Sequence, residues 1–237
     1  MTSAKQIKNR QIVLDTETTG LDPKQGHKII EIGCVEMINR RLTGNNYHQF
    51  IQPDRDIDEG AQAVHGISNE FLADKPRFAD VVKDFIEYID GAELIIHNAP
   101  FDVGFIDHEF KWVGEEYGAV ASYCSVIDTL VMARKMRPGK KNNLDALCKE
   151  YEINNAHREL HGALLDAELL AEVYLRMSGG QSTLLLDSED VSTSAAGGVT
   201  IKQLSKNRKP IKIIRANDEE LKAHQAIVEK MRKTSWQ

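Results

Sequence analysis

The stretch Ile12-Val13-Leu14-Asp15-Thr16-Glu17-Thr18-Thr19-Gly20 places two carboxylates at the end of an apolar, β-branched run. Such a run is typical of a buried strand, and residues two apart on a strand point to the same face. Two carboxylates side by side raise each other's pKa, whereas a divalent cation accepts oxygen ligands from both. The pair therefore predicts a metal site for phosphoryl chemistry. Two solvated acids at a strand end are the alternative that this segment leaves open.

Two further segments place acids beside regular elements. The first, residues 94–102, is an apolar run that ends in an acid, and apolar residues at helical spacing put Asp102 near a helix N-terminus, where negative charge is favoured. The second, residues 161–166, opens a strongly amphipathic helix. His161 and Asp166 are five residues apart, which does not fit one helical face. His161 is therefore predicted to lie in the loop before the helix, free to reach the metal site.

Regular elements alternate along the first 180 residues. Strands are predicted at 11–15, 28–37, 47–52, 92–97 and near 123–127, and helices at 77–89, 101–112, from 128, at 143–151 and at 162–177. Strands followed by alternating strands and helices indicate an α/β layer fold.

Three short motifs follow one another in this chain. They are Asp-x-Glu-Thr-Thr-Gly at 15–20, Asn-x-x-Phe-Asp at 98–102 and His-x-Ala-x-x-Asp at 161–166. In this order they resemble the motifs of the DnaQ-like 3′→5′ exonucleases with a catalytic histidine. The resemblance spans about residues 11–180. It implies a ribonuclease H-like α/β domain, a mixed central sheet flanked by helices, followed here by a flexible C-terminal extension.

The resemblance also implies a reaction, the hydrolysis of DNA phosphodiesters from the 3′ end with release of nucleoside 5′-monophosphates. Asp15, Glu17, Asp102 and Asp166 would hold two divalent ions, Mg²⁺ or Mn²⁺, and His161 would accept a proton from the attacking water. An imidazole pKa near ~6.5 suits that task at neutral pH.

Substrate contacts are expected from the metal ligands Asp15, Glu17 and Asp166 and from His65. His65 lies in Val-His-Gly-Ile, residues 64–67, which resembles the family segment that covers the terminal nucleotide. Many relatives carry Pro-Glu-Ala just before it, whereas residues 58–61 here are Asp-Glu-Gly-Ala, so no contact from this loop to the 3′ hydroxyl is assigned. Phe101 is either a stacking ring or a core residue, and the core is favoured. His97 either lines the site or is a satisfied core histidine.

Composition divides the chain into four parts. Residues 1–180 form the exonuclease domain, 181–186 resemble a sliding-clamp-binding peptide with anchors Gln181, Leu184 and Leu186, and 187–198 read as a flexible linker. In residues 199–237, Asn217 and Glu220 have the spacing of a helix N-cap, and apolar residues follow at helical intervals. This short helix is expected to bind a partner, and docking on its own domain is the alternative.

Charge is distributed unevenly over the 237 residues. The net charge is −6, but residues 199–237 carry +6, which leaves −12 on residues 1–198. An acidic nuclease domain argues against strong independent affinity for long DNA and favours a partner that delivers the 3′ end. No apolar stretch is long enough for a membrane helix, and Cys34, Cys124 and Cys148 lack metal spacing. We expect reduced core thiols in a bacterial cytoplasmic protein.

An exonuclease domain followed by a clamp-like peptide, a linker and a partner-binding helix resembles the proofreading exonucleases of replicative DNA polymerase holoenzymes, and this resemblance implies the same role here. Its substrate would be a single-stranded or frayed DNA 3′ end. The expected partners are the polymerase catalytic subunit through the C-terminal segment, the sliding clamp through residues 181–186 and a small theta-like accessory subunit, with no membrane. An RNA-trimming exonuclease of the ribonuclease T or oligoribonuclease type shares the motifs and stays open. A catalytically silent polymerase–clamp scaffold is the other alternative, although all four acids and the histidine are present.

Overall fold

The computed structural model describes residues 9–156, 158, 160–179, 217, 220, 222, 224, 225 and 228. The chain separates into two compact units, residues 1–184 and 185–237. The predicted clamp peptide at 181–186 and the predicted linker at 187–198 lie outside the described residues. No described helix is both long and apolar enough to cross a membrane.

A mixed sheet forms the centre of the first unit. Its strands are β1 (Arg10–Thr18), β2 (Ile29–Ile38), β3 (Arg41–Leu42), β4 (Tyr47–Phe50), β5 (Glu93–Ile96) and β6 (Ser125–Asp128). The order is β3-β2-β1-β5-β6, with β4 also paired to β2. β1 runs antiparallel to β2 and parallel to β5, and β5 runs parallel to β6. The predicted mixed sheet is therefore confirmed, and each predicted strand is present.

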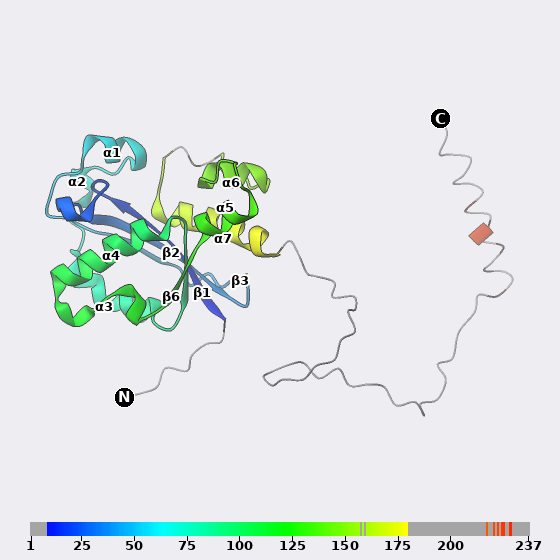
Figure 1. Cartoon of the computed structure of the whole chain (residues 1–237), viewed down its shortest axis with the longest axis horizontal. Coiled ribbons are helices and arrows are strands. Elements are labelled where there is room, and N and C mark those ends of the chain that lie inside the picture. The colour runs from blue at the N-terminus through cyan, green and yellow to red at the C-terminus, as the bar shows by residue number, and fades with distance from the viewer. Residues whose placement is uncertain are drawn as a thin grey trace, which may run out of the picture. The chain divides into compact units, whose positions relative to one another are not determined.

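Helices cover both faces of this sheet (Figure 1). Helices α3 (Phe78–Ile89) and α4 (Ala99–Val113) pack on one face, where Ile12 and Leu14 of β1 meet Phe85 and Phe105. Helices α5 (Thr129–Met136), α6 (Leu144–Glu150) and α7 (Ala163–Gly179) pack on the other, where Val13 lies in their cluster. The alternation of β1 side chains thus sends odd-numbered residues, the two acids included, toward the α7 face.

Two short helices were not predicted, α1 (Glu59–His65) and α2 (Asn69–Leu72). Seven and four residues are too few to show a helical period. Short 3₁₀ turns at Pro23–Gln25, Glu115–Tyr117 and Val120–Ser122 were missed for the same reason. Helix α1 follows Asp58, whose backbone N–H donates to the Thr19 carbonyl at 3.0 Å, so it is fastened to the end of β1.

Gly33 allows α7 to approach the sheet closely. It pairs with Asp15 across β1 and β2, and a Cβ placed on it would lie 2.2 Å from backbone atoms of Ala163 and Leu164. The first turn of α7 therefore rests on bare backbone beside Asp15. This contact carries Asp166, one turn further along, to the acids of β1.

The predicted N-cap in the C-terminal segment is confirmed. The Asn217 backbone N–H donates to Glu220 Oε2 at 2.9 Å, and the Glu220 N–H donates to Asn217 Oδ1 at 2.9 Å. This reciprocal pair is a capping box. Residues 220, 222, 224, 225 and 228 are helical, and the Val228 side chain is exposed.

Candidate active site

The four predicted carboxylates line one cavity of about 330 Å³ together with His161. β1 supplies Asp15 and Glu17, α4 supplies Asp102 and α7 supplies Asp166. Sequence elements separated by some 150 positions thus converge at the end of β1. The remaining lining residues are Thr16, His97, Asn98, Phe101, Asn143, Leu144, Asp145, Arg158 and Leu170.

Burial and mutual repulsion dominate the electrostatics of this cavity. Burial, then the charges of Asp166 and Glu31, raise the pKa of Glu17 to about 8. Burial, followed by the charges of Asp102 and Glu17, raises the pKa of Asp15 well above its usual value. Burial and mutual repulsion favour the protonated carboxyls, and the charge of Arg158 only partly opposes this. The site is therefore strongly attractive to a positive ion at neutral pH.

Asp102 is held by the strand that carries the other acids. Thr16 donates to Asp102 Oδ1 through its hydroxyl at 2.7 Å and its backbone N–H at 3.1 Å. Burial raises the pKa of Asp102 to about 7, against the effect of these hydrogen bonds. The turn into α4 uses Asn98 at φ 68°, a left-handed conformation that asparagine tolerates, followed by Pro100 in the first turn. The prediction that Asp102 lies near a helix N-terminus is confirmed.

His161 lies in the loop just before α7, as predicted, and its side chain is 44% exposed. Its Nδ1 is 3.4 Å from Asp166 Oδ2. Its backbone N–H donates to the Val64 carbonyl at 3.1 Å, so the loop is tied to helix α1. The position of His161 is therefore set from both sides, by α7 and by α1.

The donor set fits a hard divalent cation. Ligand atoms of Glu17, His161 and Asp166 all lie within 4.8 Å of one another, and Asp15 and Asp102 line the same cavity. Oxygen-rich sites of this kind suit Mg²⁺ or Mn²⁺. A bound cation would also lower the raised pKa values of Asp15 and Glu17, because its charge opposes that of the clustered carboxylates.

A second cavity of about 540 Å³ lies next to the first and shares Thr16, Glu17 and Phe101 with it. Its other walls come from the end of β1 and from α1: Thr18, Gly20, Leu21, Asp58, Gly60, Ala61, Val64 and His65. Apolar walls beside a carboxylate suit a nucleotide base and sugar next to the reacting phosphate. Phe101 packs against Phe105 at 5.0 Å between ring centroids and against the core cluster, but it is only partly buried and lines both cavities, so the core prediction is confirmed in part.

His65 is buried with one unused nitrogen. Its Nδ1 accepts the Ile67 backbone N–H at 3.0 Å, whereas its buried Nε2 has no hydrogen-bond partner among the described residues. Burial lowers the pKa of His65, so the ring is neutral at pH 7. A buried polar atom without a partner on a cavity wall is available to a substrate group. His97 has both predicted features, because its Nδ1 is 2.9 Å from Thr129 Oγ1 and it lines the first cavity.

Sequence reasoning missed the residues that arrange the acids. Thr16 lies between Asp15 and Glu17, but only the fold shows that it holds Asp102. Arg158 and Asp145 enter the first cavity from segments with no recognisable motif. Cys34 and Cys148 are buried and Cys124 is partly buried, all three as free thiols, as predicted.

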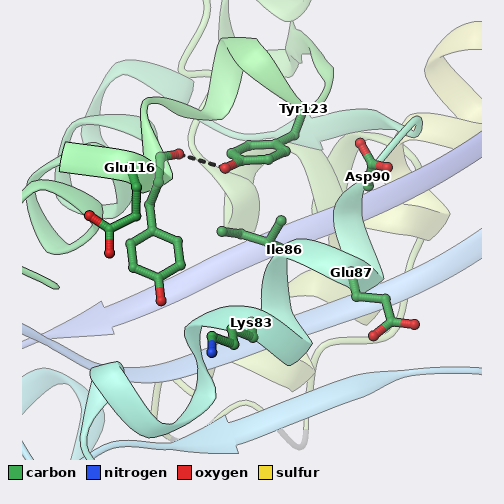
Figure 2. A pocket seen from close by; sticks show the side chains of 7 residues that line it. Lys83, Ile86, Glu87, Asp90, Glu116 and Tyr123 are labelled. Carbon is green, nitrogen blue, oxygen red and sulfur yellow. Dashed lines mark hydrogen bonds between the residues drawn. The ribbon is translucent and has the colours of Figure 1, made fainter. Parts of the chain in front are cut away.

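Another cavity, of about 600 Å³, contains none of the predicted site residues (Figure 2). It lies between α3, which carries Lys83, Ile86 and Glu87, and the segment of Glu116 and Tyr123. Tyr123 donates its hydroxyl to the Tyr117 carbonyl at 2.6 Å. The smaller, acid-lined cavity is the better candidate for catalysis, because it gathers four carboxylates and the pKa values of Asp15, Glu17 and Asp102 are raised there.

A mixed sheet with acids from β1, α4 and α7 gathered at the end of its middle strand β1, and a histidine on the adjoining loop, defines a metal-dependent nuclease. The family model described as "Exonuclease" matches residues 12–174. The chain belongs to this exonuclease family, and it is a 3′→5′ exonuclease.

Sequence similarity to known proteins extends over nearly the whole length of the chain. The chain is 53% identical to DNA polymerase III subunit epsilon of Salmonella typhimurium over 228 residues, 94% of each chain. It is 52% identical to the Escherichia coli K12 subunit of the same name, again over 94% of each chain. Among solved structures, exonuclease X in complex with 5′ overhanging duplex DNA is 29% identical, with a TM-score of 0.54 over 73% of this chain and 94% of that one.

Proposed function

We propose that this chain is the proofreading subunit of a bacterial replicative DNA polymerase, removing mismatched nucleotides from the DNA 3′ end. The observation that carries the proposal is the convergence of Asp15, Glu17, Asp102, Asp166 and His161 beside an apolar cavity of nucleotide size. Identity of about half to epsilon subunits over 94% of the chain supports the polymerase context.

The four carboxylates would hold two divalent ions, Mg²⁺ or Mn²⁺. Such ions, when bound, lower the pKa of water and stabilise a leaving 3′ oxygen. The chain itself orients Asp102 through Thr16 and brings Asp166 to the strand through the close packing at Gly33. His161, whose side chain is 44% exposed, accepts the proton of the attacking water.

The second cavity would receive the terminal nucleotide. Phe101 offers a half-buried ring, and His65 offers Nε2 to a polar group of the substrate. Asp15, Glu17 and Asp166 would contact the scissile phosphate through the metal ions. The backbone N–H of His161 donates to the carbonyl of Val64, which lines the second cavity. The position of the terminal nucleotide in this cavity and the position of His161 would therefore depend on one another.

Partner proteins would supply the affinity for DNA that the acidic domain lacks. Residues 181–186, with Gln181, Leu184 and Leu186, would bind the sliding clamp, and 187–198 would act as the linker. Residues 199–237 would bind the polymerase catalytic subunit, for which the capping box and exposed Val228 provide a preformed helix start and an apolar contact. A theta-like subunit would bind the domain. The work would be done in the cytoplasm, where the polymerase copies the chromosome.

The test compares the wild type with Asp15→Ala on 5′-labelled single-stranded DNA and on RNA, each with Mg²⁺ or EDTA. Asp74→Ala serves as the control, since Asp74 is exposed and lines neither cavity. We expect a metal-dependent DNA ladder shortening from the 3′ end, lost in Asp15→Ala and kept in Asp74→Ala. Cleavage confined to RNA would support the RNA-trimming alternative, and no cleavage even with the polymerase added would support the silent scaffold.

A further inference from the structure

The guanidinium of Arg158 lies inside the acid cluster. Its Nε is 2.5 Å from Asp166 Oδ1 and its Nη2 is 2.6 Å from Asp166 Oδ2, a fork that engages both oxygens. Its Nη1 donates to Asp145 Oδ1 at 2.7 Å. The Arg158 and Asp166 side chains are 6% and 5% exposed, so this is a buried ion pair.

This fork competes directly with a metal ion. Asp166 belongs to the group of ligand atoms that fits a cation, with Glu17 and His161. A divalent ion bound there would lie a few ångströms from the guanidinium, and like charges at that separation repel strongly in a buried site. Arginine in proteins does not escape by losing its proton. One of the two cations must therefore leave Asp166.

The same guanidinium also contacts the histidine. Arg158 Nη2 is 3.0 Å from His161 Nδ1. Arginine can only donate, so Nδ1 must accept, and the ring proton of neutral imidazole is then on Nε2. The contact therefore occupies Nδ1 of His161. Arg158 thus contacts both the carboxylate of Asp166 and Nδ1 of His161.

Asp145 provides a place for the displaced side chain. It lies on the lining of the same cavity and is 55% exposed, whereas Asp166 is buried. Arg158 can keep Asp145 while it releases Asp166, so its charge does not have to cross to bulk water. Removing one partner of a buried pair is strongly unfavourable unless another charge replaces it, and an arriving metal ion would be that replacement.

We propose that Arg158 competes with a divalent ion for Asp166, and that Asp145 retains the guanidinium when the ion binds. The inference rests on the proposed metal site. It makes Arg158 a positioning residue that lowers the affinity of the site for metal.

The experiment is calorimetric titration of the full chain with Mn²⁺ alone, which needs no nuclease activity. We expect Arg158→Gln to bind Mn²⁺ on the order of tenfold more tightly, because a competing charge has gone. Arg158→Lys keeps the charge but loses the fork, so it should fall between Gln and wild type. Arg10→Gln, which breaks a different, part-buried pair with Glu36 at 2.6 Å, is the matched control and should leave Mn²⁺ affinity unchanged.

Asp145→Asn tests the second half. With its retaining partner weakened, Arg158 should hold Asp166 more firmly, so this variant should bind Mn²⁺ more weakly than wild type. In the Arg158→Gln background the same change should have little effect. An equal loss in both backgrounds would mean that Asp145 acts only through its charge on the metal, and would overturn its retaining role.

Two results separate this inference from the proposed function. If wild type binds Mn²⁺ but Arg158→Gln binds it equally or more weakly, Arg158 supports the metal ligand instead of competing, and the inference is overturned alone. If wild type and Arg158→Gln both fail to bind Mn²⁺, the metal site itself is refuted and the inference with it.

Discussion

Substituting Gly33 by alanine tests whether the packing of α7 on β2 sets the active site. The added Cβ would lie 2.2 Å from backbone atoms of Ala163 and Leu164, where ordinary contacts begin at 3.4 Å. Backbone cannot rotate away as a side chain can, so the start of α7 must move by about 1 Å. Overpacking of this kind costs about 1–3 kcal/mol of stability. A 1 Å displacement of a catalytic group can cost ~10²-fold in rate, so we expect kcat to fall by about that factor.

The assay combines urea unfolding with kcat on a single-stranded DNA substrate at saturating Mg²⁺. Gly104→Ala is the matched control, because Gly104 lies within α4 and a Cβ there meets no atom within 4 Å. That variant should gain about 0.5–1 kcal/mol from helix propensity and keep its kcat. A destabilised Gly33→Ala protein with wild-type kcat would show that the contact supports the fold but does not position Asp166, and the reasoning would be wrong.

Three further predictions concern the acids and the base. His161→Ala should slow the chemical step by about 10²–10⁴-fold in single-turnover kinetics, with Mn²⁺ binding by titration nearly intact; unchanged turnover would remove His161 from the mechanism. In EDTA the protein should lose stability as pH rises from about 5 to 8, because the folded pKa of Glu17 is raised from 4.5 to about 8 and that of Asp102 from 3.8 to about 7. Folding therefore favours their protonated forms, and this contribution disappears as each ionises; thermal melts should show the trend, and saturating Mg²⁺ should reduce it. Thr16→Val removes the hydroxyl hydrogen bond to Asp102 and keeps the one from the backbone N–H, so we expect the free energy of unfolding to fall by about 1–3 kcal/mol. Unchanged stability in urea unfolding would contradict the role assigned to the hydroxyl.

Much of the site could be predicted from the sequence, because the relevant signals are local. The apolar run before Asp15 and the two-residue spacing to Glu17 indicate a strand with both acids on one face, and β1 has that form. The spacing of Asn217 and Glu220 indicates a helix start, and the reciprocal hydrogen bonds are present. Such features depend on neighbours within a turn or a strand, which the chain order specifies directly.

What only the tertiary structure decided is how these pieces meet. Helix α1 is too short to show a period, yet it forms a wall of the second cavity and anchors His161 through Val64. Gly33 is one glycine among sixteen, and its role depends on a helix 130 positions away. No sequence motif indicates the ion pair between Arg158 and Asp166, because an arginine in a loop is ordinarily expected to be solvated. Contacts between distant segments depend on how the elements pack. Burial then removes water, so each charged group interacts mainly with its nearest neighbours.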